Sequence, residues 1–245
     1  MKLQRLSLLW CGVMAGFAMA AGVPCRADAD PQKINAAIQK GIQFLKTAQA
    51  DDGSWTSPNS LGITALVTHA LLISDVPAQD PAVQRGLKLI EGAIRPDGGM
   101  YTDKSTHKNY ETAIALLALQ SANSDGRYQE AIDKAVKFLE HQQWDEEEVG
   151  DASQVNYGGA GYGSKSRPDL SNTAFFLDAL KAAGVSPSDP AVQKALIFVS
   201  RCQNLKGEHN PTEFAGLVND GGFYYTPAAG GASMAGQTAD GGLRS

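Results

Sequence analysis

The pattern of hydrophobic and polar positions repeats along the chain. A nine-residue segment, apolar at its second, sixth, eighth and ninth positions, occurs four times, at residues 37–45, 82–90, 131–139 and 191–199. This spacing places the apolar side chains on one side of a helix. Asp80-Pro81 and Asp189-Pro190 precede two of the segments, and Asp followed by Pro is typical of a helix start. The pattern predicts four amphipathic helices.

A second kind of helix is predicted after three of these segments. Each begins near a Thr-Ala pair and has a Leu seven residues after the Thr: Thr64-Ala65 with Leu71, Thr112-Ala113 with Leu119, and Thr173-Ala174 with Leu180. These stretches are apolar nearly all round, so we expect them to be buried on most faces. The pairs predict an all-α fold of tandem repeats near residues 31–75, 80–123, 128–184 and 189–245. The fourth repeat has no second helix, so we expect this chain to be part of a larger ring.

Glycine-rich loops join the two kinds of helix. The chain has 26 glycines, and many lie in four loops in which an aromatic side chain follows the glycines. The loops are Asp52-Gly53-Ser54-Trp55, Asp97-Gly98-Gly99-Met100-Tyr101, Gly158-Gly159-Ala160-Gly161-Tyr162 and Asp220-Gly221-Gly222-Phe223-Tyr224-Tyr225. Glycine permits the positive φ angles of tight turns. We expect most of these aromatic side chains to fold back and tie one repeat to the next.

Composition and charge narrow the functional classes. The 245 residues carry a net charge of −5 and are 43% hydrophobic, which excludes collagen-like and disordered chains and gives no basic surface for nucleic acid. The acidic run Asp145-Glu146-Glu147-Glu148, with Asp151, lacks the alternating spacing of a calcium loop. We expect a solvated insertion there and no metal site.

The first 29 residues resemble a secretory signal peptide. Lys2 and Arg5 precede a nearly uncharged apolar stretch at residues 6–23, and Ala27-Asp28-Ala29 has small residues at the cleavage spacing. Cleavage after Ala20 and retention as an uncleaved membrane anchor are alternatives. We expect the protein to be periplasmic or extracellular, with a mature domain at residues 30–245. Cys202 is then its one remaining cysteine, and its apolar surroundings predict a buried structural thiol.

The repeats resemble those of the terpenoid cyclase and protein prenyltransferase superfamily. The resemblance is carried by Gln49-Ala50-Asp51-Asp52-Gly53-Ser54-Trp55, together with the alternation of two kinds of helix, and it covers about residues 31–245. It implies an α/α toroid of inner and outer helices, here incomplete. The families include squalene-hopene cyclases, protein prenyltransferase β-subunits and other prenyltransferase and squalene oxidase repeat proteins. Complement-type thioester domains share the fold but need a Cys-Gly-Glu-Gln element, which this sequence lacks around Cys202.

Residues 158–180 carry the part of the resemblance that bears on chemistry. In squalene-hopene cyclases an inner helix begins Asp-x-Asp-Asp-Thr-Ala, and the middle acid protonates an alkene. Here the corresponding stretch is Asp169-Leu170-Ser171-Asn172-Thr173-Ala174, so Ser171 replaces that acid. A serine hydroxyl is too weak an acid for this step. In the prenyltransferase pattern Ser171 replaces a zinc-ligand Cys instead, and Lys165 and Arg167 lie near the positions that bind diphosphate.

Each candidate site residue has a functional and a structural interpretation. Asp169 is either a remnant active-site carboxylate or a helix N-cap. Lys165 and Arg167 either clamp an anion such as a diphosphate or are solvated. Tyr110, Phe175 and Phe176, on the enclosed helices, are the candidates for lining an isoprenoid cavity. His69, His107, His141 and His209 are scattered singly, so we expect no catalytic role for them and predict no metal site.

These residues support two functional hypotheses. The first is an exported, catalytically degenerate toroid that binds an isoprenoid, another apolar ligand or a protein partner. The second is an isoprenoid-acting enzyme, cyclase-like or prenyltransferase-like, with its catalytic groups rearranged or beyond Ser245. No cofactor is predicted, with zinc required only if the prenyltransferase alternative holds. Self-association through the unpaired last helix and association with a membrane surface are two further hypotheses. We expect no binding of nucleic acid.

Overall fold

The computed structural model describes residues 30–245, and within them the regular secondary structure is helical. The predicted signal peptide lies outside these residues. The helices are α1 (Pro31–Ala48), α2 (Leu61–Ile73), α3 (Pro81–Gly92), α4 (Lys108–Ser121), α5 (Gln129–Gln142), α6 (Glu146–Val149), α7 (Leu170–Ala182) and α8 (Pro190–Arg201), with a 3-10 turn at Ala228–Gly230. The predicted all-α class is confirmed. None of the described helices is both long and apolar enough to cross a membrane.

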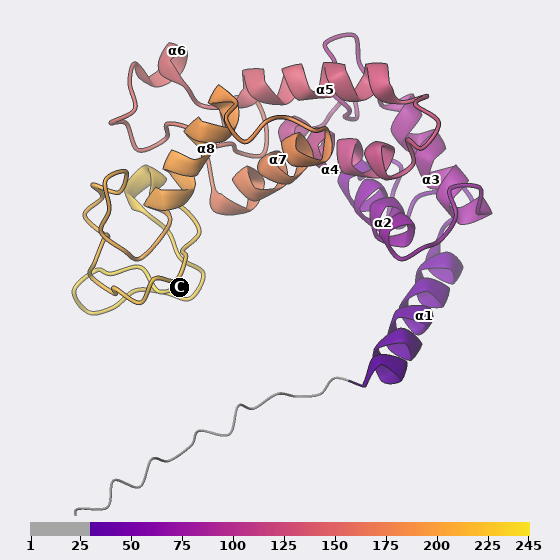
Figure 1. Cartoon of the computed structure of the whole chain (residues 1–245), viewed down its shortest axis with the longest axis horizontal. Coiled ribbons are helices and arrows are strands. Elements are labelled where there is room, and N and C mark those ends of the chain that lie inside the picture. Colours follow the sequence, from indigo (N-terminus) through magenta and orange to yellow (C-terminus); the bar gives the residue numbers. More distant parts are fainter. Residues whose placement is uncertain (1–29) are drawn as a thin grey trace, which may run out of the picture.

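The helices form an arch (Figure 1). The second helix of each pair, α2, α4 or α7, lies on its inner side, and α3 and α5 lie on its outer side. Helix α1 extends from one end of the arch, and the C-terminal residues fold at the other end. The main core joins α2, α4 and α7, with the most extensive packing between α2 and α4. The arrangement corresponds to part of the predicted α/α toroid.

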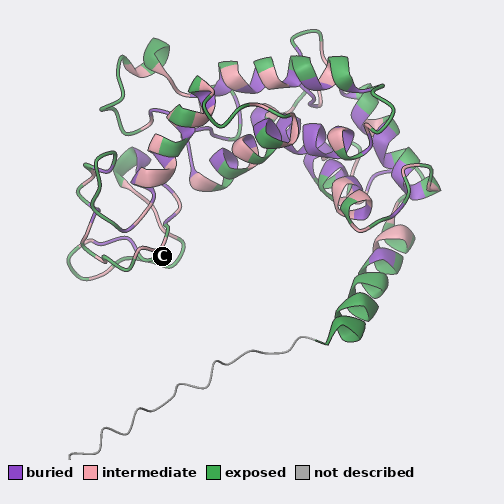
Figure 2. Cartoon of the chain, in the orientation of Figure 1, coloured by how far each residue is buried: buried purple, intermediate pink, exposed green. Residues whose placement is uncertain are grey.

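The apolar sides of the outer helices differ in how far they are buried. Val83, Leu87 and Ile90 of α3 are fully buried, as are Ile132 and Leu139 of α5, as the pattern predicts. Helix α1 differs, because Ile42 is its one buried residue while Ile34, Ile38 and Phe44 are 46%, 43% and 69% exposed. Figure 2 shows α1 almost entirely exposed. A buried stripe on α1 is therefore a wrong prediction, because among residues 30–245 no other helix covers this side of it.

The inner helices are less uniformly buried than their composition suggests. Helix α4 lies between α2 and α7 and buries ten of its residues. Helix α2 is more apolar than α4, yet Ile63, Leu66 and Ile73 stay 42%, 40% and 65% exposed. Helix α7 exposes Ser171 and Ala174 at its start. Among the described helices, the predicted burial on most faces is thus fully reached in α4, which has an inner helix on each side.

The glycine loops pack directly on the outer helix of the following repeat. Gly53, Gly98 and Gly158 have φ of +90°, +89° and +82°. A Cβ at these positions would lie 3.0, 2.6 and 1.8 Å from the carbonyl oxygens of Arg85, Lys134 and Lys194, respectively. Both the positive φ and the close approach require glycine. The loops are therefore fixed turns between helices, as the sequence predicts.

Residues 203–245 form a folded irregular lobe. The sequence predicts a long loop there, at residues 207–242, but Phe214, Tyr224 and Leu243 pack into a small buried cluster with isolated β-bridges around it. Asn204 Nδ2 donates to the Leu243 carbonyl at 2.8 Å and ties the two ends of the lobe together. Cys202, at the junction with α8, is fully buried, and burial raises the pKa of its thiol, as expected for a structural cysteine.

Candidate functional site

The first turn of α7 holds the residues that correspond to the cyclase acid motif. Asp169 is the N-cap of α7 and is 1% exposed. Its Oδ1 accepts the Asn172 backbone N–H at 2.9 Å, and its Oδ2 accepts the Asn172 side-chain amide at 2.7 Å. Ser171 is exposed. The carboxylate in this turn is therefore engaged in capping the helix, and the acid position of the motif presents a hydroxyl.

The two candidate cations near this turn have separate partners. Lys165 Nζ lies 2.6 Å from Glu148 Oε1 and donates to the Gln143 carbonyl at 2.7 Å. Arg167 lies over the ring of Tyr225, with 5.6 Å between the guanidinium carbon and the ring centroid. The pKa of Tyr225 is raised, mainly because its side chain is buried and secondly because it interacts with Asp169. The structure gives Lys165 and Arg167 structural contacts and does not direct them to a common anion.

An aromatic cluster joins the starts of α4 and α7. The ring centroids of Tyr110 and Phe175 lie 5.5 Å apart in an edge-to-face arrangement, and those of Tyr110 and Tyr162 lie 5.8 Å apart. His107 contacts Tyr162 edge-on at 4.9 Å. Tyr110 and Phe175 are half-buried and Tyr162 is 39% exposed, so the cluster has a surface open to a ligand. We define Tyr110, Tyr162 and Phe175 as the aromatic cluster.

The sequence prediction for this cluster needs one correction and one addition. Phe176 is fully buried in the main core and offers no surface to a ligand, because it points away from Phe175 on the helix. Tyr162 ties the third repeat to the second, as the loop pattern predicts, and its ring also joins the cluster, which the sequence does not predict. Its backbone carbonyl accepts the Asn109 N–H at 3.1 Å, which brings the glycine loop over the start of α4. Neighbouring Gly62 on α2 lets Tyr110 approach closely, since a Cβ there would lie 2.8 Å from Tyr110 Cε1.

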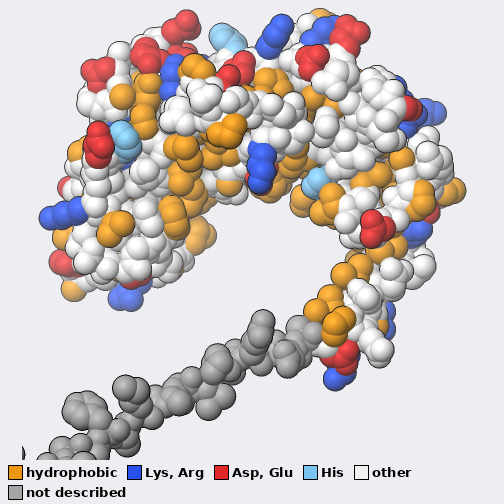
Figure 3. Space-filling view, viewed as in Figure 1, with side chains coloured by type: hydrophobic (Ala, Val, Ile, Leu, Met, Phe, Trp, Pro, Cys, Tyr) orange, Lys and Arg blue, Asp and Glu red, His pale blue; other side chains and the backbone are white. Residues whose placement is uncertain are grey.

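Apolar side chains continue from this region along the inner side of the arch. Ile63 and Leu66 of α2 are 42% and 40% exposed. In the space-filling view hydrophobic side chains gather along the inner side of the arch (Figure 3). His69 on α2 contacts Ser121 on α4, with 3.0 Å between Nδ1 and Oγ, and burial lowers its pKa. The inner surface therefore combines apolar contacts with few charges.

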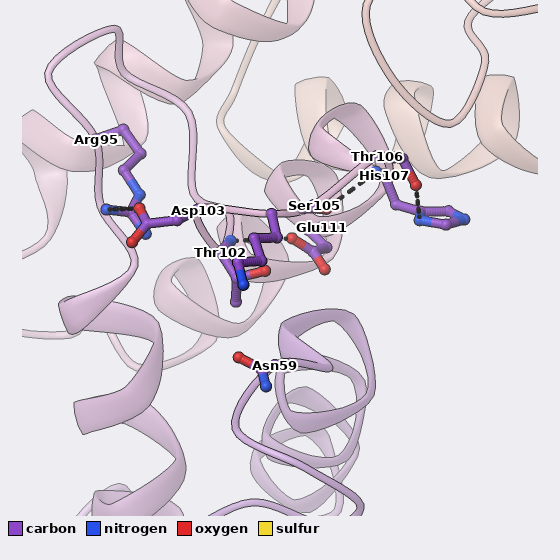
Figure 4. Close-up of a pocket in the computed structure, with 9 residues that line it drawn as sticks. Asn59, Arg95, Thr102, Asp103, Ser105, Thr106, His107 and Glu111 are labelled. Atoms are coloured by element: carbon purple, nitrogen blue, oxygen red, sulfur yellow. Dashed lines mark hydrogen bonds and ion pairs between the residues drawn. The ribbon is translucent and has the colours of Figure 1, made fainter.

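A polar pocket of about 570 Å3 lies at the start of α4 (Figure 4). The loop before α2, the loop between α3 and α4 and the first turn of α4 enclose it. The lining residues are Asn59, Arg95, Thr102, Asp103, Lys104, Ser105, Thr106, His107 and Glu111. Arg95 Nη1 and Asp103 Oδ1 form an ion pair at 2.9 Å on one wall. Figure 4 shows the Glu111 side chain directed toward Thr102 and Ser105. The pocket is thus polar at its walls and acidic at its floor.

Glu111 is the chemically unusual residue of this pocket. It is 5% exposed, and its Oε2 accepts the Thr102 backbone N–H at 3.3 Å. Burial raises the pKa of its carboxyl, and hydrogen bonds from Ser105 and Thr102 and the charge of His107 oppose that shift. Sequence reasoning missed Glu111. The signal was present, because Glu111 immediately precedes Thr112-Ala113, as Asn172 precedes Thr173-Ala174.

Metal-ligating side chains come together away from the start of α7. Among residues 30–245, three such side chains near enough to share one ion are found at Asp145, Glu147 and Glu148. Asp145 is the N-cap of the short helix α6 in a capping box, and Lys194 lies 3.3 Å from it. The expected solvated insertion thus contains a short helix whose carboxylates form ion pairs. Its position offers no ligands to Asp169.

Comparison with known proteins places the fold in one family. Residues 56–227 match the squalene-hopene cyclase C-terminal domain family, a range that includes the aromatic cluster, the polar pocket and the first turn of α7. No curated protein matches the sequence. With most of the chain matched, and with an all-helical arch of inner and outer helices, this protein belongs to the squalene-hopene cyclase C-terminal domain family.

Proposed function

We propose that this protein is an exported, catalytically degenerate member of the family that binds an isoprenoid or similar apolar ligand. The observation that carries the proposal is the first turn of α7, where Ser171 occupies the acid position and Asp169 is bound by Asn172. Protonating an alkene needs a strong, undissociated carboxylic acid directed at the substrate. A hydroxyl and a capping carboxylate cannot supply one, whereas the apolar inner surface is retained.

The aromatic cluster is the best-supported ligand contact. Tyr110 and Phe175 hold each other edge-to-face, so their exposed edges are fixed before a ligand arrives. Aromatic side chains supply much apolar contact at little entropic cost, and their faces attract electron-poor groups. Ile63 and Leu66 extend this surface along α2 for a long hydrocarbon chain. A linear isoprenoid alcohol fits this combination better than a diphosphate, because Lys165 is paired with Glu148.

Binding of farnesol, followed by titration calorimetry, tests the proposal. Tyr110→Ala and Phe175→Ala should each raise the Kd for farnesol at least fivefold. Phe44→Ala is the matched control, because Phe44 is an exposed aromatic on α1 and should leave the affinity unchanged. Incubation with squalene, followed by mass spectrometry, should give no cyclised product. Cyclised product from the native chain, or equal farnesol binding by all three variants, would refute the proposal.

Glu111 favours a second candidate function, an isoprenoid-acting enzyme whose acid is rearranged. Its carboxyl is buried, its pKa is raised, and it follows Tyr110 of the aromatic cluster directly in the sequence. A carboxyl held neutral by burial is the kind of group that acts as a general acid. If squalene is turned over, Glu111→Gln should abolish turnover while Ser171→Ala should not. Turnover that survives in Glu111→Gln would exclude this candidate.

Export belongs to the proposal as well. The signal-peptide pattern of residues 1–29 supports it, and export would remove the protein from the cytoplasmic donors and acceptors of protein prenylation. Expression of the full chain in a bacterium, with N-terminal sequencing of the periplasmic fraction, should give a mature chain that starts at Asp30. An uncleaved chain in the membrane fraction would support the anchored alternative and refute cleavage.

A further inference from the structure

The three internal repeat junctions are built alike. At each one, a loop glycine with positive φ lies against the backbone of the fourth residue of the next nine-residue segment. This fourth residue is basic in all three junctions. The pairs are Gly53 with Arg85, Gly98 with Lys134 and Gly158 with Lys194. The fifth residue of the segment is small and buried there. At Gly86 of α3, a Cβ would lie 2.2 Å from Thr68 Oγ1, and Ala135 and Ala195 are fully buried. Bulk at this position is therefore incompatible with the junction.

A glutamine bridges two of these junctions. Gln49 Nε2 donates to the carbonyls of Gly53 and Ala82, each at 2.9 Å. Gln143 Nε2 donates in the same way to Gly158 and Ala191, each at 2.9 Å. Ala82 and Ala191 are the first residues of the nine-residue segments that follow. One amide thus fastens its own loop to the next outer helix.

A fourth junction is formed but has no helix on it. Gln203 Nε2 donates to Gly221 at 2.9 Å, and the Gly222 N–H donates to Asp220 Oδ1 at 2.9 Å, as Gly99 donates to Asp97. Gly221 has φ +72°, yet a Cβ on it would meet no atom within 4 Å. Phe223 is 46% exposed, whereas Met100 at the equivalent position is fully buried. The loop is therefore shaped for an outer helix that the described chain does not place there.

Helix α1 is the complementary case. It carries the first nine-residue segment, with Lys40 and Gly41 at the fourth and fifth positions, and a Cβ on Gly41 would meet no atom within 4 Å. Phe44, the eighth residue, is 69% exposed, whereas Phe138 and Phe198 at this position are 7% and 0% exposed. Phe138 packs on Tyr101 of its junction, with 5.8 Å between ring centroids. Helix α1 thus has the contact surface of an outer helix, and no glycine loop of the described residues packs against it.

We propose that α1 of a second copy of this chain docks on the loop around Gly221, so that copies associate head to tail. In each of the three closed junctions the helix packs on the loop through the nine-residue segment, and α1 carries the same segment uncovered by the described loops. The occupant of the open junction is therefore identified as α1 of another copy of this chain. Helix α1 and the C-terminal lobe lie at opposite ends of the arch, so the contact joins different molecules (Figure 1). By the register of the closed junctions, Lys40 covers Gly221, and the amide of Gln203 reaches the carbonyl of Ala37. Phe44 packs toward Gly222, displacing Ser245, whose Oγ donates to Asp220 at 2.6 Å.

Sedimentation velocity of the full chain over a concentration series tests this contact. The native protein should associate as its concentration rises. Gly41→Leu should raise the dissociation constant at least tenfold, because the fifth position has no room for a side chain in a closed junction. It should not unfold the single chain, since the space around Gly41 is open. Gln39→Leu is the control, because it places the same leucine side chain on α1 at the third position, where Gln84 and Gln193 are exposed.

A cross-linking experiment separates this contact from general hydrophobic aggregation. Phe44→Cys and Phe223→Cys are made in separate chains in which Cys11 and Cys25 are changed to Ser, and native Cys202 is fully buried and does not compete. Mild oxidation should give a disulfide between copies in the mixture of the two variants, at least tenfold more than in either variant alone. A concentration-independent monomer, association unchanged by Gly41→Leu, or equal cross-linking in single variants and mixture would each overturn the proposal.

Discussion

The starts of α4 and α7 are built on the same plan and differ in one residue that matters for chemistry. In α4, Thr112 Oγ1 accepts the Met100 N–H at 2.9 Å and donates to the Lys108 carbonyl at 2.7 Å. In α7, Thr173 Oγ1 accepts the Ala160 N–H at 3.0 Å and donates to the Asp169 carbonyl at 2.8 Å. The Thr of each Thr-Ala pair thus joins a glycine loop to the inner helix that follows it.

The residue before each Thr distinguishes the two helix starts. In α7 it is Asn172, which holds the capping Asp169, so the polar groups of this turn are used in structure. In α4 it is Glu111, which borders the polar pocket, and His107 at the cap makes no side-chain capping bond. One scaffold therefore supports a structural turn in α7 and a turn with a protonatable group in α4. The resemblance to a cyclase motif marks α7, whereas the buried carboxyl with a raised pKa lies in α4.

Removing the cap of α7 should have the largest effect on stability. Asp169→Ala removes an N-cap and leaves the buried backbone and side-chain N–H groups of Asn172 without an acceptor. We expect a loss of about 3 kcal/mol in the free energy of unfolding, because caps contribute about 1 kcal/mol and unsatisfied buried donors cost about 1–3 kcal/mol. Urea denaturation followed by circular dichroism measures this loss.

Asp189→Ala is the matched control for that experiment. Asp189 caps α8 through the Ala191 N–H at 2.9 Å and accepts from no second side chain in the described hydrogen bonds. Its loss should cost about 1 kcal/mol. Equal losses for the two variants would show that Asp169 does no more than an ordinary cap, and would reopen its interpretation as an active-site carboxylate.

The pH dependence of stability should identify Glu111 as the titrating residue of the α4 turn. Burial raises the pKa of its carboxyl in the folded protein above the ordinary 4.5. The folded state then binds its proton more tightly than the unfolded state does, so this contribution is present below pH 4.5 and is lost as pH rises through the folded pKa. Glu111→Gln should remove this decline and equal or exceed the native stability at neutral pH.

Glu130→Gln serves as the comparison, because Glu130 is a surface residue whose pKa is lowered by Lys134. Its replacement should leave the decline with rising pH intact. If Glu111→Gln shows the same pH profile as the native protein, the carboxyl is ionised without cost, and the proposed rearranged acid loses its physical basis.

The repeating helices could be predicted because their signal is periodic. The nine-residue segments and the Thr-Ala pairs indicate α2, α3, α4, α5, α7 and α8 directly. Helices α3 and α5 bury most of the apolar positions that the pattern marks, whereas α8 buries Phe198 and leaves Leu196 46% exposed. Helix α1 satisfies the same pattern and remains exposed, because burial depends on a neighbouring loop that the segment does not encode. The lobe at residues 203–245 has no period, and its core of Phe214, Tyr224 and Leu243 forms through contacts distant in sequence.

The candidate site was only partly predictable for the same reason. Tyr110 and Phe175 could be selected because both lie on inner helices. Phe176 is adjacent to Phe175 and equally apolar, and only the rotation of α7 separates a surface residue from a core residue. Glu111 looks like an ordinary helical glutamate until the loop at residues 102–107 folds over it. Its place before Thr112-Ala113 marks the position, but its burial arises from tertiary structure, so the local pattern could not reveal the raised pKa.

The smallest effect should come from restoring an acid to α7. Ser171→Asp introduces a carboxylate at an exposed position in the first helical turn, where it interacts favourably with the helix dipole by about 0.5 kcal/mol. Urea denaturation at pH 7 should show this gain, and Ser171→Asn, which carries no charge, should show less of it. The exposed acid is fully solvated, so squalene should still not cyclise. Cyclised product from Ser171→Asp, detected by mass spectrometry and absent from Ser171→Asn, would mean that one carboxyl is all that α7 lacks. The distinction between a structural start of α7 and a start of α4 that holds a buried, protonatable carboxyl would then be wrong.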